Sequence, residues 1–276
     1  MVAGSRGSRS GGSQPEGQHF IRSGIVAAEL VDGAEIGQTD TVVEIGAGWG
    51  RLTRPLARRA GRVIAVEIDD KLAARLVRSF RNETNVSIVH GDILRTELPD
   101  GEWRAFGNIP FGATTQTLGR LLSDPTTGLR RADLLVQLEA ARKRASVERS
   151  TLVSLTWQPW WKLTLERRVP RRGFEPPPSV DAGLLVARRR GRPVLDADER
   201  IAYVTFLRRV FDRGGWPVRR SLRAAIPVKR WKALARGRGI ALDALPAELD
   251  VWDWVVVFKE TQRWGLQHPS QRRRPA

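Results

Sequence analysis

Residues 41–50 read TVVEIGAGWG, an apolar run that ends in three alternating glycines. The run predicts a buried β-strand over 41–45, and the glycines permit a tight turn into a helix at about 52–59. The dinucleotide fingerprint G-x-G-x-x-G is incomplete, because arginine occupies position 51. The turn therefore favours a different adenosine-bearing ligand, and a purely structural strand-to-helix connection is the alternative.

Strands and helices alternate on either side of this segment. The pattern predicts further strands at 62–69, 86–90, 105–111 and 133–138, with helices at about 72–80 and 118–122. Such alternation is typical of an α/β fold with a doubly wound, Rossmann-like parallel sheet. Two later strands, at 161–169 and 180–188, have no helix between them and predict an antiparallel edge. Residues 191–276 read as short helices, which predicts a small helical C-terminal domain.

Composition narrows the class of protein. The chain has 276 residues, 41% of them hydrophobic, and no cysteine, so it can bury a core but cannot use disulfides, Cys-based zinc sites or a thiolate nucleophile. No apolar run is long enough for a membrane span or a signal peptide, which predicts a cytoplasmic protein. The histidines lack ligand spacing, so no metal site is expected. We expect a flexible Gly/Ser/Arg-rich tail over 1–17, one domain over 18–190 and a basic one over 191–276.

The charge predicts a polyanionic partner. Lys and Arg number 47 against 30 acidic residues, a net charge of +17, and most of the excess lies after Ala187. The densest basic stretch runs from Phe206 to Lys232, where Trp216 and Trp231 are candidates for base stacking. The predicted RNA-binding residues in this stretch are Arg208, Arg209, Arg219, Arg220, Arg223, Lys229, Arg230 and Lys232.

Two carboxylates are predicted at the same sheet edge as the glycine turn. Glu67 lies near the end of the second strand, and Asp92 follows the third. Each alone reads equally as a solvated strand end or a helix cap. Because the carboxyl ends of parallel strands form the ligand-binding edge of such folds, the three features together predict a nucleoside site.

The tetrapeptide Asn108-Ile109-Pro110-Phe111 ends the fourth predicted strand. The Asn108 side-chain oxygen and the Ile109 carbonyl can accept both protons of a base amine and favour a pyramidal nitrogen. Phe111 can stack on that base, which must first leave its own stack. The alternative is a helix-initiating proline beside a core aromatic residue.

Six motifs in register give the chain a family resemblance. They are QHFI at 18–21, VEIGAG at 43–48, EID at 67–69, GDIL at 91–94, FGNIPF at 106–111 and FEPPPSVD at 174–181. The chain resembles the rRNA adenine N6-methyltransferases from about Gln18 to Arg190, and more closely their Erm branch. The resemblance implies methyl transfer from S-adenosylmethionine to N6 of one adenine in the peptidyl transferase loop of 23S rRNA. It further implies macrolide–lincosamide–streptogramin B resistance, and we expect a monomer.

The resemblance also assigns roles to residues. Asn108, Ile109, Pro110 and Phe111 would be catalytic, and Phe111 and Phe174 would stack on the two faces of the target adenine. The expected cofactor-binding residues are His19, Ile21, Gly46, Gly48, Glu67, Ile68, Asp92, Ile93 and Asn108. The chain departs from relatives at His19, where many have Asn, at Trp49, where many have a basic residue, and at Phe111, where Tyr is commoner.

Three alternatives remain at this stage. A KsgA-type enzyme would dimethylate adenines of 16S rRNA, but Ile109 and the run at 137–144 look more like the Erm branch. A non-catalytic nucleic-acid-binding protein would not need the intact tetrapeptide at 108–111. A DNA adenine methyltransferase usually carries two prolines after its Asp or Asn. The sequence does not distinguish mono- from dimethylation.

Overall fold

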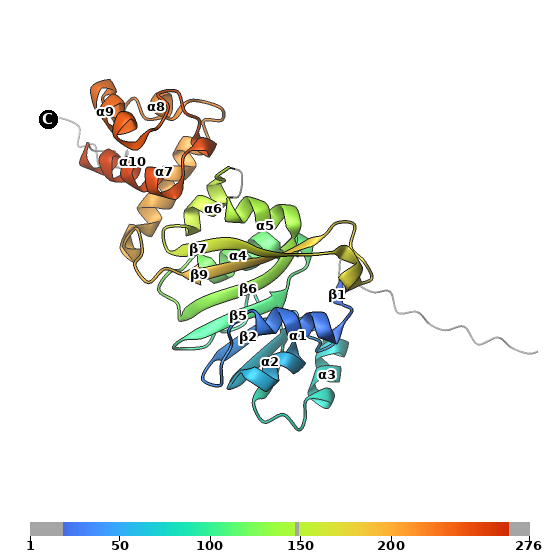
Figure 1. Cartoon of the computed structure of the whole chain (residues 1–276). Helices are drawn as coiled ribbons and strands as arrows, with labels where there is room; N and C mark the ends of the chain where they lie inside the picture. Colours follow the sequence, from blue (N-terminus) through green and yellow to red (C-terminus); the bar gives the residue numbers. More distant parts are fainter. Residues whose placement is uncertain (1–18, 147–148, 265–276) are drawn as a thin grey trace, which may run out of the picture.

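The computed structural model describes residues 19–146 and 149–264, so the predicted tail over 1–17 lies outside the described residues. The described chain forms a seven-stranded sheet in the order β4-β3-β2-β5-β6-β9-β7 (Figure 1). The strands are β2 Thr41–Ile45, β3 Arg62–Glu67, β4 Val86–His90, β5 Trp103–Asn108, β6 Leu129–Gln137, β7 Trp161–Val169 and β9 Ala182–Arg189. The apolar sequences of the inner strands β2 and β9 suit strands that are covered on both faces, whereas the edge strands β4 and β7 are more exposed.

The predicted doubly wound sheet is confirmed. Neighbouring strands from β4 to β6 pair in parallel, whereas β9 pairs antiparallel with both β6 and β7. The antiparallel strand therefore lies one position in from the edge, which β7 occupies. A separate pair, β1 (Phe20–Ile21) and β8 (Phe174–Glu175), joins the N-terminal segment to the Pro-rich loop.

Two strand boundaries differ from the prediction for clear physical reasons. Strand β5 stops at Asn108, because Pro110 lacks an N–H and leads into the short 3-10 helix Phe111–Ala113. Strand β6 begins at Leu129, earlier than expected, because two of its three charged residues face the interior. Arg131 and Asp133 are buried and form an ion pair with one another. From the sequence alone, the charged residues at the start of this strand read as part of a polar loop.

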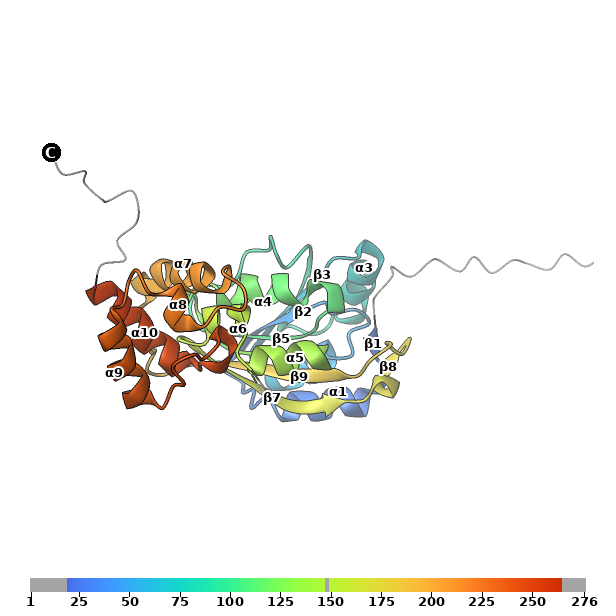
Figure 2. The same ribbon diagram turned by 90° about the horizontal axis from the view of Figure 1, so that it is seen from above.

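Helices cover both faces of the sheet (Figure 2). One buried cluster contains residues of α1 (Gly24–Asp32), α2 (Thr53–Arg59) and α3 (Asp70–Ser79) with one face of the central strands. The other contains residues of α4 (Thr114–Leu122), α5 (Leu138–Ala145) and α6 (Leu152–Trp157) with the opposite face. Neighbouring β2 residues divide accordingly, since Val42 belongs to the first cluster and Val43 to the second.

The C-terminal helices extend the second cluster. They are α7 (Arg200–Phe211), α8 (Val218–Ser221), α9 (Val228–Arg238) and α10 (Val251–Arg263), and they lie beyond α6 in Figure 1. Tyr203 of α7 meets Trp160 edge to face, with ring centroids 6.3 Å apart. Tyr203 and Trp254 belong to the same buried cluster as Val43 of β2. Apolar packing therefore runs without a break from the sheet into the helical region.

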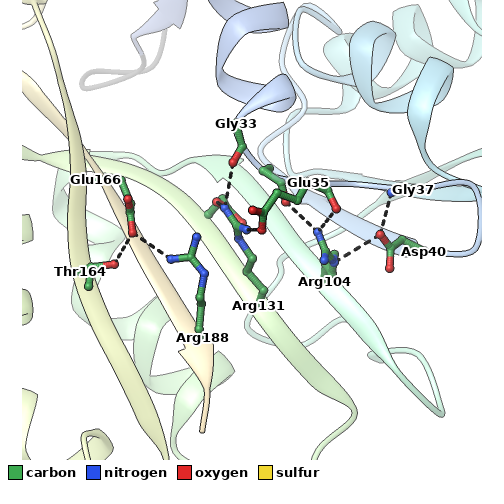
Figure 3. Close-up of polar contacts among 11 residues, drawn as sticks. Gly33, Glu35, Gly37, Asp40, Arg104, Arg131, Thr164, Glu166 and Arg188 are labelled. Carbon is green, nitrogen blue, oxygen red and sulfur yellow. Dashed lines mark hydrogen bonds and ion pairs between the residues drawn. The ribbon is translucent and has the colours of Figure 1, made fainter. Parts of the chain in front are cut away.

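A buried polar network fastens the end of α1 to the sheet (Figure 3). The Arg131 guanidinium donates two hydrogen bonds of 2.7 Å to Asp133, one of 2.7 Å to Glu35 and one of 3.2 Å to the Gly33 carbonyl. Arg104 of β5 donates to the Glu35 carbonyl at 3.0 Å. Pairing leaves few donors of the buried Arg131 unsatisfied, so removing either charged partner would be costly. The network fixes α1, and hence the β1 segment that precedes it.

None of the helices within residues 19–146 and 149–264 combines the length and apolarity of a bilayer span.

Candidate active site

A pocket with about 840 Å³ of empty space opens at the carboxyl edge of the parallel strands. Its lining combines β1, the glycine turn, the ends of β3 and β5, the loop after β4 and the start of α4. The predicted site residues that line it are His19, Gly46, Glu67, Ile68, Asp92, Ile93, Asn108, Ile109, Pro110 and Phe111.

Glu67 is held in the pocket wall by backbone donors. Its Oε2 accepts the Gly48 N–H at 2.7 Å, and its Oε1 accepts the Asp69 N–H at 3.0 Å. Each carboxylate oxygen has a second lone pair, so Glu67 can also accept hydrogen bonds from a pair of hydroxyls. Gly46 and Gly48 have φ values of +69° and +56°, a backbone conformation that favours glycine.

Asp92 presents one oxygen to the pocket. Its Oδ1 accepts the Leu94 N–H at 2.9 Å, while its carbonyl accepts the N–H of Thr96 at 2.8 Å. These bonds fix the loop after β4 and leave Oδ2 as an acceptor. The Asp92 carboxylate can therefore receive the amino group of a ligand.

The side-chain amide of Asn108 has a defined orientation. Its Nδ2 donates a hydrogen bond to the His19 carbonyl oxygen. Because a carbonyl only accepts, the amide nitrogen must face His19, and the oxygen Oδ1 is the atom left for another partner. No described residue donates to Oδ1. The amide is thus oriented to accept a proton from a ligand amine.

His19 and Phe111 form an aromatic corner beside Asn108. Their ring centroids lie 5.7 Å apart with planes inclined by 46°. The His19 Nδ1 donates to the Pro176 carbonyl at 2.9 Å, which leaves Nε2 as an acceptor when the ring is neutral. Phe111 is half-buried and lines the pocket. The corner joins the N-terminal segment, the end of β5 and the Pro-rich loop.

Three predicted site residues lie elsewhere. Phe174 is only 2% exposed and packs in the cluster around α1, so the prediction that it stacks on the target adenine is wrong. Ile21 is not among the residues that line the pocket, and its side chain is buried in the same cluster, so its predicted contact with the donor would use its backbone and stays a prediction. Gly48 lines no part of the pocket, and it acts through Glu67 instead. A β-bridge pairs Ile21 with Phe174, which explains why both turn inward.

Glu44 is a buried carboxyl group that sequence analysis missed. It is 0% exposed, and neither of its oxygens has a hydrogen-bond partner within the described structure, nor has the hydroxyl of Thr53. Burial raises the pKa of Glu44 to about 8; the proximity of Thr53 lowers it, and the negative charge of Glu67 raises it further. Glu44 is therefore mostly protonated at neutral pH. The available signal was an acidic residue inside the apolar strand TVVEI.

The eight predicted RNA-binding residues are all exposed on or beside α7, α8 and α9. Trp216 is exposed and holds the Arg220 guanidinium 3.9 Å from its ring centroid. Trp231 is 3% exposed, so its predicted role in base stacking is wrong. Its place on the inner side of α9 makes it a core residue of the helical region. Nowhere in the described part of the chain do three His, Asp or Glu side chains gather as metal ligands.

Comparisons with known proteins agree with this geometry. Residues 13–263 match the model of the family described as "Ribosomal RNA adenine dimethylase". An rRNA adenine N-6-methyltransferase of Corynebacterium diphtheriae is 38% identical over 205 residues, 74% of this chain and 79% of that protein. The mycinamicin-resistance protein MyrB of Micromonospora griseorubida is 34% identical over 257 residues, which are 93% of this chain and 81% of MyrB. The crystal structure of the 23S rRNA methyltransferase ErmE superposes with a TM-score of 0.80 at 30% identity, over 88% of this chain and 99% of that one.

Proposed function

The chain belongs to the ribosomal RNA adenine dimethylase family and is an Erm-type rRNA adenine N6-methyltransferase, and on this premise we propose that its substrate is 23S rRNA. The proposed target is one adenine of the peptidyl transferase loop, with S-adenosylmethionine as methyl donor. Methylation there would confer macrolide–lincosamide–streptogramin B resistance. The similarity to MyrB and to ErmE supports this substrate and this phenotype.

The residues around the pocket fit the proposed donor. Glu67 can accept hydrogen bonds from the two ribose hydroxyls, and Asp92 can accept one from the adenine amine. Gly46 lines the pocket without a side chain, and its positive φ would strain any other residue. The aliphatic side chains of Ile68 and Ile93 line the same wall. When bound, S-adenosylmethionine would supply an electrophilic methyl group on a sulfonium.

The acceptor side is built to hold a base amine. The Asn108 Oδ1 and the Ile109 carbonyl would each accept a hydrogen bond from one amine N–H, which favours a pyramidal nitrogen whose lone pair is less delocalised into the ring. Phe111 stacks on the flipped adenine and fixes its plane. Rate enhancement then comes from positioning and from preorganised dipoles, with no covalent enzyme intermediate. The oriented Asn108 amide, held by the His19 carbonyl inside the same pocket as Glu67 and Asp92, is the observation that carries the proposal.

The remaining parts of the proposal concern organisation. Residues 18–190 would form the methyltransferase unit, and residues 191–276 would bind rRNA phosphates, with the exposed basic side chains of α7, α8 and α9 among the contacts. We further propose that the protein acts as a monomer in the cytoplasm, on 23S rRNA that is free or in early large-subunit precursors.

One assay tests the substrate. Purified protein is incubated with labelled S-adenosylmethionine and, separately, protein-free 23S rRNA, 30S particles and duplex DNA. Label in 23S rRNA, mapped to one adenine and lost in Asn108→Ala, is the expected result. Label only in 30S particles would favour the KsgA-type alternative and refute the 23S proposal. No label in any substrate would refute the proposed reaction altogether.

A further inference from the structure

A second hollow lies beside the glycine turn, outside the pocket described above. It lies between the turn, the N-terminal part of α1, one side of α2, and α3. Four arginines line it, and no carboxylate does. Those arginines, with the aromatic residue beside them, are Trp49, Arg51, Arg54, Arg58 and Arg75, which we call the arginine hollow.

The charges of the arginine hollow are not neutralised within the described chain. None of its four arginines forms an ion pair there, whereas Arg59, the next residue along α2, pairs with Asp32. All four are exposed. Four like charges around one cavity repel one another, and an anion in the cavity would relieve that repulsion. The hollow therefore has the electrostatic character of an anion site.

Aromatic rings hold two of these guanidiniums in place. The Arg75 guanidinium lies 4.3 Å from the ring centroid of Trp49, and that of Arg54 lies 5.4 Å from Phe80. Trp49 is 43% exposed, so its stacking on Arg75, rather than core packing, accounts for its place in the turn. Side chains fixed in this way lose less entropy when they bind a ligand. The sequence alone does not show what Trp49 contacts.

The arginine hollow adjoins the active site through one aromatic contact. Trp49 meets Phe20 edge to face, with centroids 5.9 Å apart. Phe20 in turn lines the pocket that contains Asn108, and a Cβ on Gly48 would come within 2.7 Å of its ring. A ligand in the hollow would thus lie next to the wall of the reaction site. The basic helices α8 and α9 lie far from it, beyond α6 (Figure 1).

We propose that the arginine hollow binds backbone phosphates of the substrate RNA, close to the target adenine. This inference rests on the proposed function, because it takes the acceptor to be RNA. Four guanidiniums that come from the glycine turn, α2 and α3 suit several phosphates of a strand better than one phosphate ion. Together with the C-terminal helices, the hollow would give the enzyme two separate RNA-binding surfaces. The hollow, next to the active site, would position the flipped base, and the C-terminal helices would add affinity.

The test compares Arg51→Gln/Arg58→Gln with Arg62→Gln/Arg81→Gln. Both variants lose two exposed arginines without ion pairs in the described chain, but only the first pair lines the hollow. Binding to protein-free 23S rRNA is measured by filter binding from 50 to 300 mM KCl. Each phosphate contact contributes ~0.7 to 0.9 to the slope of log K against log salt, or about five- to eightfold in affinity at 0.1 M. We expect the hollow variant, which loses two contacts, to bind about 25- to 60-fold more weakly at 0.1 M, with a slope reduced by ~1.4 to 1.8.

Further measurements separate the explanations. Calorimetry should give the hollow variant wild-type affinity for S-adenosylmethionine, and Arg51→Lys/Arg58→Lys, which keeps the charge, should recover most RNA binding. An unchanged salt slope, or equal losses in both glutamine variants, would overturn the inference. The inference would also be overturned if the hollow variant lost binding of inorganic phosphate but bound RNA with the same affinity as the wild type. If the wild type methylated only 16S rRNA, the 23S proposal would fail, and the same binding series on 16S rRNA would still decide the role of the hollow.

Discussion

Replacing Glu44 by glutamine should make the protein more stable, and increasingly so as the pH rises. The folded chain keeps a proton on Glu44 up to a pKa of about 8, whereas the unfolded chain releases it near 4.5. Between these values the folded state binds more protons, so wild-type stability falls as pH rises. Each pH unit is worth about 1.4 kcal/mol, and 8 minus 4.5 is 3.5 units, so the total approaches about 5 kcal/mol.

The glutamine side chain matches the protonated carboxyl in shape but does not ionise. The stability advantage of Glu44→Gln should therefore grow from about 1 kcal/mol at pH 5 to about 3 at pH 7 and nearly 5 at pH 9. Urea unfolding followed by tryptophan fluorescence at these three pH values measures it. Glu83→Gln, at an exposed position, is the matched control and should show no such trend. An advantage of Glu44→Gln that does not change with pH would refute the reasoning.

Three further substitutions test individual residues. Phe111→Ala should lower methyl transfer by about 5- to 160-fold, since base stacking is worth ~1 to 3 kcal/mol, while calorimetric donor binding stays unchanged. Loss of donor binding instead would contradict the stacking role. Phe174→Ala should lower the free energy of unfolding by ~3 to 5 kcal/mol, as for other core aromatic residues, measured by the same urea titration. A much smaller loss would show that the Phe174 ring is exposed and not part of the core. Gly48→Ala should weaken donor binding, because its Cβ would lie 2.7 Å from Phe20 and strain the turn that holds Glu67; wild-type calorimetry would count against this.

The sequence predicts the parts of the site that depend on local pattern. An apolar run before alternating glycines specifies β2 and its turn, and strand ends then bring Glu67, Asp92 and Asn108 to one edge. The direction of a side chain in irregular structure is different. Phe174 lies in a Pro-rich loop, where no periodicity says whether a ring faces solvent or core, and only the pairing of β8 with β1 turns it inward.

Long-range charge pairing is equally hidden from local pattern. Arg131 and Asp133 look like solvated residues, and the structure buries them because Glu35 and the end of α1 complete their hydrogen bonds. The arginines of the hollow are spread from position 51 to 75 and come together only when α2 and α3 pack beside the turn. Neither grouping has a signature that spacing alone reveals.

The hydrogen bond between Asn108 and His19 makes the orientation of the Asn108 amide depend on residues that are distant in sequence. His19 lies 89 positions before Asn108 in the sequence, and its ring donates a hydrogen bond to the carbonyl of Pro176, which lies 157 positions after His19. A displacement at either of these two contacts would reorient the Asn108 amide without any substitution at Asn108. Substitutions in the Pro-rich loop would therefore change how the target base is held while Asn108 itself stays the same.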